Sequence, residues 1–161
     1  AIDFGHTNYK IAFIENDNII SFQKHSYNDR LIFDDLIAKI KSMGCDKILC
    51  CNVLNESIIN SIVSDFPQDM KNILKFFSSE DCQKHITLAY NDNIKRLGVD
   101  RALNLVGAST KTKNDLIVID AGTATTIDYL DSSKNHIGGI ILPGKNLIDN
   151  IFHEMLDFDF S

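Results

Sequence analysis

Long apolar runs, an excess of basic residues and paired cysteine spacings are all absent from this sequence. The sequence has 16 lysines and arginines and 22 aspartates and glutamates, which gives a net charge of −6. This balance argues against a nucleic-acid partner, which normally requires a basic patch or stripe. The apolar runs are far shorter than the ~20 residues that cross a bilayer, so no membrane partner is expected. No signal peptide is visible at the start.

The cysteines and histidines show no spacing typical of a metal site. The four cysteines lack a C-x-x-C pair, so we interpret them as small buried hydrophobic residues in a reducing compartment, with the cytoplasm as the expected location. Among the five histidines, His6 lies in a candidate motif, and most of the others are expected to be surface or satisfied side chains. Both chain ends are abrupt, and we expect a fragment of a longer protein.

The apolar pattern predicts an α/β fold in which one series of strands and helices begins twice. The first series has the order βββαβαβα, with elements at 2–4, 11–14, 19–22, 32–43, 47–53, 58–66, 73–77 and 99–109. Its first three strands form a predicted meander, because a turn-like cluster at 15–18 separates two β-rich runs. A polar connection is expected before the last helix.

Residues at the helix ends support these boundaries. Asn28 or Asp29 is the predicted N-cap of the first helix, and Gly44 stands just past its end. Asn55 is the predicted N-cap of the second helix, which Pro67 is expected to terminate.

The second series starts at residue 115 and stops after its first helix. Strands are predicted at 116–119, 125–130 and 136–142, and Pro143 with Gly144 is expected to open a helix. The predicted domains are therefore 1–114 and 115–161, which form a duplicated βββαβαβα unit with a truncated second copy.

The two series place the same residue types at the same point. Asp3 and Asp120 each end a first strand, and each is followed by a glycine-containing hairpin with threonines. Two such units facing each other would bring two carboxylates and two hairpins to one cleft. Tight glycine turns bind phosphate through backbone N–H groups, and the carboxylates would hold Mg²⁺.

Each motif also has a purely conformational alternative. Asp3-x-Gly5-x-Thr7 alone is weak evidence, since strands often end in Asp and Gly. The segment 120–128 is more specific, because small residues stand where a packed strand would have bulk, and a hairpin without a ligand is the less favoured alternative. The glycines of 138–144 indicate either a close contact with a ligand or a crowded strand–helix junction.

The helix start at 97–101 carries a further candidate pair. Asp100 lies in the first turn, where ordinary capping of the helix dipole is the alternative explanation. Arg101 is electrostatically unfavourable at a helix start, and a carboxylate or phosphate partner would explain it.

These four segments in this order resemble type III pantothenate kinases, which belong to the actin-like, sugar-kinase and Hsp70 superfamily. That family carries Asp-x-Gly-Asn-Thr followed by Lys, a Tyr-led segment ending in Gly-x-Asp-Arg, Asp-x-Gly-Thr-Ala-x-Thr-x-Asp, and Gly-Gly-x-Ile-x-Pro-Gly. The matching segments here are 3–10, 90–101, 120–128 and 138–144. The resemblance implies actin-like, ribonuclease H-like units.

The resemblance also implies an activity, the ATP-dependent phosphorylation of pantothenate to 4′-phosphopantothenate in coenzyme A biosynthesis. Asp100 would be the general base for the attacking hydroxyl. The implied phosphate- and ATP-binding residues are Asp3, Gly5, His6, Thr7, Lys10, Gly122 and Thr123. The implied substrate-binding residues are Tyr90, Gly98, Val99, Arg101 and Gly139, with Arg101 on the pantothenate carboxylate. Asp3 and Asp120 are the implied metal ligands.

The implied cofactors are Mg²⁺ or a similar divalent ion with ATP, and a monovalent cation, K⁺ or NH₄⁺. The implied assembly is a homodimer whose second subunit helps to close the pantothenate site. The sequence departs from the family where His6 replaces the usual Asn, and where the segment after Tyr90 lacks the usual Pro and is one residue longer. A non-catalytic accessory or regulatory member, and another phosphotransferase of the superfamily, are the alternatives left open.

Overall fold

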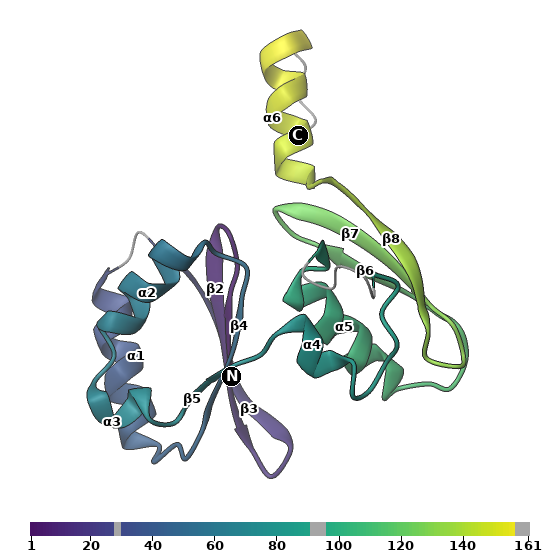
Figure 1. The fold of residues 1–161 in the computed structure, drawn as a ribbon. Helices are drawn as coiled ribbons and strands as arrows, with labels where there is room; N and C mark the ends of the chain where they lie inside the picture. Colours follow the sequence, from purple (N-terminus) through teal and green to yellow (C-terminus); the bar gives the residue numbers. More distant parts are fainter. Residues whose placement is uncertain (28–29, 91–95, 157–161) are drawn as a thin grey trace. The chain divides into compact units, whose positions relative to one another are not determined.

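The computed structural model describes residues 1–27, 30–90 and 96–156. They divide into two compact units, Ala1–Ser78 and Ser79–Ser161, and each unit contains one sheet (Figure 1). The first sheet is mixed and the second is antiparallel, so the predicted α/β class is confirmed. The predicted domain boundary after residue 114 marks where the repeat begins again in the sequence, whereas the compact units are defined by their internal contacts. The predicted boundary therefore stays a prediction.

The first unit is a five-stranded sheet with helices on one face. The strand order is β3-β2-β1-β4-β5, with antiparallel pairing from β3 to β1 and parallel pairing from β1 to β5. The strands are β1 (Ile2–Phe4), β2 (Asn8–Glu15), β3 (Asn18–Ser26), β4 (Ile48–Asn52) and β5 (Leu74–Phe76). The helices are α1 (Arg30–Ser42), α2 (Glu56–Ser64) and α3 (Gln68–Lys71), and all three lie on the same face (Figure 1).

Local chemistry explains several of these boundaries. Asn16 and Asp17 have φ angles of 49° and 62°, which suit the tight turn between β2 and β3 and residue types that tolerate positive φ. Gly44 has a φ of 61°, and it closes α1 with hydrogen bonds from its own N–H to the Lys41 carbonyl and from Cys45 to Ile40. Asn55 caps α2 as predicted, since its Oδ1 accepts the N–H of Ile58 at 2.9 Å. The predicted N-cap at Asn28 or Asp29 lies outside the described residues.

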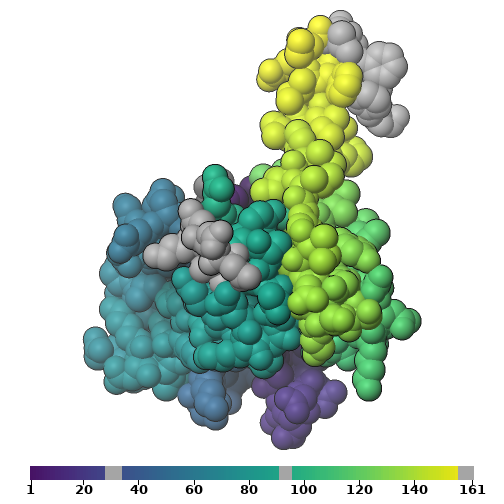
Figure 2. Space-filling view, turned by 45° about the vertical axis from the view of Figure 1, so that its right-hand side comes forward, coloured from purple at the N-terminus to yellow at the C-terminus, as the bar shows by residue number. Residues whose placement is uncertain are grey.

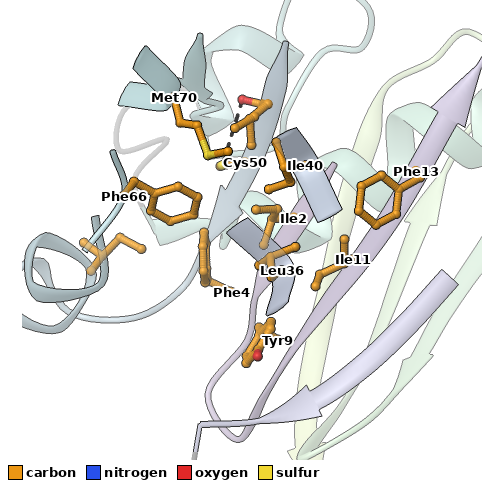
Figure 3. Packing of buried hydrophobic residues seen from close by; sticks show 12 residues of the cluster. Ile2, Phe4, Tyr9, Ile11, Phe13, Leu36, Ile40, Cys50, Phe66 and Met70 are labelled. Carbon is orange, nitrogen blue, oxygen red and sulfur yellow. Dashed lines mark hydrogen bonds between the residues drawn. The ribbon is translucent and has the colours of Figure 1, made fainter. Parts of the chain in front are cut away.

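The core of the first unit forms between the sheet and its helices. Alternate residues of β2 are buried, as are Leu36 and Ile40 one turn apart on α1. Figure 3 shows these side chains converging with residues of β1, β4, α3 and the connection between α2 and α3; the labelled members are Ile2, Phe4, Tyr9, Ile11, Phe13, Leu36, Ile40, Cys50, Phe66 and Met70. The core therefore fixes β1, whose end carries the first predicted motif.

The second unit packs a helix on a three-stranded antiparallel sheet. The elements are α4 (Ser79–Cys82), α5 (Val99–Ser109), β6 (Leu116–Ala121), β7 (Ala124–Leu130), β8 (His136–Pro143) and α6 (Lys145–Leu156). Leu105 of α5, Leu130 of β7, Leu88 and Leu97 form its core. On the other face of the sheet, Ile117 and Ile119 are exposed. The strand β8 leads directly into α6 (yellow in Figure 2).

Two sequence predictions about proline were wrong. The helix α2 ends at Ser64, where the N–H of Asp65 bonds back to the Ile62 carbonyl and the N–H of Phe66 to the Val63 carbonyl. Pro67 is instead the N-cap residue of α3. Pro143 is the last residue of β8, and α6 begins at Lys145. The helices α3 and α4 were not predicted, since four residues are too few to show a helical period.

No helix within the described ranges has the length and hydropathy needed to cross a membrane.

Candidate active site

The first predicted hairpin is a tight connection between β1 and β2. The Gly5 N–H donates to the Asn8 carbonyl at 3.1 Å, and the Gly5 carbonyl accepts the Tyr27 hydroxyl at 2.8 Å. A side chain at Gly5 would begin 3.0 Å from the Asn8 oxygen, so the turn favours glycine. His6 and Thr7, which complete the loop, are exposed.

Asp3 and Lys10 form an ion pair beside this hairpin. They are register partners on β1 and β2, and Lys10 Nζ lies 3.0 Å from Asp3 Oδ2. Their side chains are 33% and 43% exposed, so water screens the pair and its contribution to stability is small. Both charges are accessible to a ligand at the end of the sheet.

The second predicted hairpin joins β6 to β7 through Gly122 and Thr123. The Gly122 N–H donates to the Ala124 carbonyl at 2.9 Å, and the Gly144 N–H donates to the Thr123 carbonyl at 3.1 Å. A side chain at Gly144 would begin 2.2 Å from the Gly122 oxygen. Gly144 is therefore explained by the crowded strand–helix junction, which packs directly on this hairpin.

Asp120 is the penultimate residue of β6, next to the second hairpin, and its Oδ2 accepts a hydrogen bond from Asn104 Nδ2 of α5 at 3.0 Å. Asp3 belongs to the first unit and Asp120 to the second. The proposal that these two carboxylates share one metal ion stays a prediction.

The first turn of α5 places Asp100 over Gly98. Gly98 is the N-cap residue, and a side chain there would begin 2.5 Å from Asp100 Oδ1. The same oxygen accepts the backbone N–H of Arg101 at 2.8 Å. The carboxylate is thus held in one orientation at the helix start, where the helix dipole also favours negative charge. Val99, half-buried, begins the helix between them.

Arg101 points into the second unit and pairs with Asp128 of β7. Arg101 Nε and Nη2 donate to the two Asp128 oxygens at 2.9 and 2.7 Å, and His136 Nε2 donates to Asp128 Oδ1 at 2.8 Å. The exposed fractions of Arg101, Asp128 and His136 are 7%, 2% and 2%. The sequence predicted a carboxylate or phosphate partner for Arg101, and the Asp128 carboxylate is such a partner inside the protein.

The electrostatics of this buried group favour its charged form. Burial raises the pKa of Asp128, but hydrogen bonds from His136 and Arg101 outweigh it and leave the pKa below its ordinary value. The hydrogen bond to Asp128 raises the pKa of Arg101. The bidentate pair is thus ionised over the whole physiological range.

Gly139 and Tyr90 complete the surroundings of the pair. Gly139 is the register partner of Asp128 on β8, and a side chain there would begin 2.2 Å from Asp128 Oδ1 and 2.6 Å from Arg101 Nη2. The Tyr90 ring meets the His136 ring edge-on at 5.8 Å between centroids. Four predicted residues of the second unit, Tyr90, Asp100, Arg101 and Gly139, are therefore linked by direct contacts or through Asp128 and His136.

Sequence reasoning assigned no role to Asp128 or His136. Asp128 alternates in β7 with buried Leu130, so a charge on the core face of a strand was the available signal. His136 was expected to be a surface or satisfied residue, but it is buried and its Nδ1 has no partner within the described part of the chain. The assignment of ligand-binding roles to the predicted residues stays a prediction.

The described residues of the first unit also line an open cavity of about 490 Å³. It is lined by the start of β1, the end of β2 and the start of β4, including Ala1, Phe13 and Ile48. Because β1 runs away from it toward Gly5, this cavity lies at the opposite end of the sheet from the predicted phosphate hairpin.

Comparisons with known proteins point to one family. The family model described as Type III pantothenate kinase matches residues 1–155. A type III pantothenate kinase from Rhizorhabdus wittichii is 32% identical over 91% of this chain and 59% of its own length. One from Paramagnetospirillum magneticum is 31% identical over 95% of this chain and 62% of its own length.

A likeness at the level of structure is more distant. The type II variant of the Ppx/GppA phosphatase from Aquifex aeolicus has a TM-score of 0.51 at 15% identity, covering 98% of this chain and 55% of that one. This similarity shows the fold alone. The chain spans about 60% of the length of the curated relatives that it matches. With a family model that covers nearly all of its residues, the chain belongs to the type III pantothenate kinase family.

Proposed function

We propose that the full-length protein transfers the γ-phosphate of ATP to the hydroxyl of pantothenate, giving 4′-phosphopantothenate in the first step of coenzyme A biosynthesis. The observation that carries the proposal is the family match across residues 1–155. That range includes both glycine hairpins and the start of α5, so all the residues proposed below lie within it.

Asp100 is the proposed general base. Its carboxylate is oriented by the Arg101 N–H at 2.8 Å and lies in the first turn of α5. In this role it accepts the hydroxyl proton while the pantothenate oxygen bonds to the γ-phosphorus and the bond to the ADP oxygen breaks. Arg101 is the proposed partner of the pantothenate carboxylate, with Tyr90, Gly98, Val99 and Gly139 around it.

The two hairpins form the proposed phosphate side of the site. Gly5, His6, Thr7 and Lys10 belong to the first, and Gly122 and Thr123 to the second. Asp3 and Asp120 are the proposed ligands of Mg²⁺, since this ion takes one or two carboxylates and completes its shell with waters and phosphate oxygens. When bound, the ion neutralises charge that develops on the phosphates.

The same proposal covers the wider context of the enzyme. A monovalent cation, K⁺ or NH₄⁺, a homodimer and a cytoplasmic location are proposed by analogy with the family. Two actin-like, ribonuclease H-like units are proposed for the fold. This duplication is supported by β1–β3 and β6–β8, which are each three consecutive strands paired antiparallel.

The test is an assay of ATP-dependent phosphorylation of pantothenate by the full-length protein with Mg²⁺ and K⁺. Asp100→Asn is expected to lower kcat about 10²- to 10⁴-fold, the usual contribution of a general base. Asp69→Asn is the matched control, since Asp69 also lies in the first turn of a helix but is exposed on α3. Absence of turnover by the wild-type protein, or full turnover by Asp100→Asn, contradicts the proposal.

A binding measurement separates catalysis from an accessory role. Calorimetry with pantothenate and a nucleotide, run alongside the assay, identifies a protein that binds either ligand without consuming ATP. That result would favour a non-catalytic member of the family, for which the His6 departure is the motivating feature.

A further inference from the structure

Asp128 binds one edge of the Arg101 guanidinium group. Nε and Nη2 donate to both oxygens of Asp128 at 2.9 and 2.7 Å. The side-chain hydrogen bonds of Arg101 within the described ranges are these two, and neither uses Nη1. A bidentate pair fixes the plane of a guanidinium as well as its position, so Asp128 determines where Nη1 lies.

Asp128 is itself held from a second strand. His136 Nε2 donates to Asp128 Oδ1 at 2.8 Å, and the His136 side chain is fully buried. His136 begins β8 opposite Leu130 of β7, and the Tyr90 ring packs edge-on against it. The carboxylate therefore has little freedom to rotate, because Oδ1 accepts a hydrogen bond from the buried His136 ring in addition to the two bonds that Asp128 accepts from Arg101.

The glycine at position 139 is a requirement of this arrangement. A side chain there would begin 2.2 Å from Asp128 Oδ1, 2.6 Å from Arg101 Nη2 and 2.6 Å from the Ile127 carbonyl oxygen. No side chain fits without moving the ion pair. The glycine that the resemblance assigns to substrate binding thus has a second reason, which is to leave room for the pair.

Stability alone does not account for such a pair. Two charges lose their hydration when they are buried, and apolar residues of similar volume are often as stabilising or more so. A buried bidentate pair beside a proposed substrate residue is better explained by the geometry that it imposes.

We propose that Asp128, held by His136, is the positioning residue of the substrate site: it fixes Arg101 through Nε and Nη2 and leaves Nη1 to bind the carboxylate of the acceptor. This inference rests on the proposed function, because the carboxylate is that of pantothenate. Asp128 does not touch the substrate and acts only through Arg101.

The test compares two ligands of the full-length protein that differ at one group. Pantothenol has an alcohol in place of the carboxylate, so it cannot use Arg101 as an anion partner. For Asp128→Asn we expect the KM for pantothenate to rise about tenfold, the loss expected when one charge-assisted contact is misaligned. We expect kcat to change less than about threefold, and the inhibition constant of pantothenol less than about twofold.

A double-mutant cycle tests the same claim without a second ligand. In an Arg101→Met background, Asp128→Asn is expected to change the KM for pantothenate less than about twofold, because the group through which it acts is gone. Asp115→Asn is the control, since Asp115 also accepts hydrogen bonds in this unit, from Tyr129 and Ser132, but is exposed.

Folding of the variants is checked by far-UV circular dichroism. If Asp128→Asn does not fold, His136→Gln and His136→Phe replace it: the amide of Gln can still donate to Asp128 and is expected to keep a lower KM for pantothenate than Phe. A wild-type protein that does not phosphorylate pantothenate would refute the proposed function instead. Equal losses for pantothenate and pantothenol, an undiminished Asp128→Asn effect in the Arg101→Met background, or equal KM values for Gln and Phe would overturn the positioning role.

Discussion

Replacing Gly139 by alanine is a small change with a large expected cost. The added methyl group would begin 2.2 Å from Asp128 Oδ1 and 2.6 Å from both Arg101 Nη2 and the Ile127 oxygen. Two of these atoms belong to the buried ion pair and the third to the backbone of β7. The pair must therefore separate or the strands β7 and β8 must move apart.

The expected loss in the free energy of unfolding depends on whether the strands move apart or the ion pair separates to make room for the methyl group. Forcing an extra methyl group into a packed site costs about 1–3 kcal/mol, and separating a buried ion pair costs about 3–5 kcal/mol. Partial movement of both gives an expected loss of about 3 kcal/mol in the free energy of unfolding. With an m-value of about 2 kcal/mol/M, the urea midpoint falls by about 1.5 M.

The assay is urea unfolding followed by far-UV circular dichroism, with hydrogen exchange to locate the change. Faster exchange is expected in peptides from β7 and β8. Gly107→Ala is the matched control, because no other part of the described structure lies within 4 Å of a side chain at this exposed position near the end of α5. Alanine there is expected to stabilise the helix by about 0.5–1 kcal/mol.

Equal urea midpoints for the two variants, within error, would refute a steric clash at position 139. A destabilised Gly139→Ala variant whose hydrogen exchange increases only outside β7, β8 and α5 would refute the proposed cause. In that case the loss would not come from the pair of Arg101 and Asp128.

Three further predictions concern other parts of the site and its scaffold. Asn55→Ala is expected to lose about 1 kcal/mol of stability through the missing N-cap of α2, whereas Asn60→Ala, exposed on the same helix, is not; equal urea midpoints would contradict this. Because the pKa of Asp128 is depressed in the folded protein, its contribution to stability is complete above about pH 4, the ordinary range of an aspartate, and is lost as the pH falls through the folded pKa. In the Asp128→Asn variant the urea midpoint should therefore fall less steeply below pH 4 than in the wild type. An unchanged slope would contradict this prediction. Tyr27→Phe removes the hydrogen bond to the Gly5 carbonyl, so the KM for ATP is expected to rise about threefold with the KM for pantothenate unchanged. A higher KM for pantothenate with an unchanged KM for ATP would contradict a role of the Gly5 hairpin in ATP binding.

Local chemistry made much of the fold predictable. The turn at Asn16 and Asp17, the glycine after α1 and the Asn55 cap each depend on residues adjacent in sequence. The strands and the long helices followed from the period of their apolar residues. The short helices α3 and α4 gave no such signal, and Pro143 was misplaced because a proline can end a strand as readily as open a helix.

The candidate site was predictable only in part. The hairpins and the helix start at Gly98 were visible because their glycines and acidic residues lie close together in sequence. The pairing of Arg101 with Asp128 joins residues 27 positions apart, and spacing says nothing about such a contact. The unfavourable charge at the helix start indicated that Arg101 needed an anion, but sheet register was required to find it.

The most direct test of the account is a crystal structure of the full-length protein with bound pantothenate. We expect one carboxylate oxygen of pantothenate within about 3.2 Å of Arg101 Nη1, its reacting hydroxyl within the same reach of Asp100, and Asp128 still paired with Nε and Nη2. Pantothenate bound with its carboxylate away from Arg101, or an Arg101 that has left Asp128 to reach it, would contradict the account.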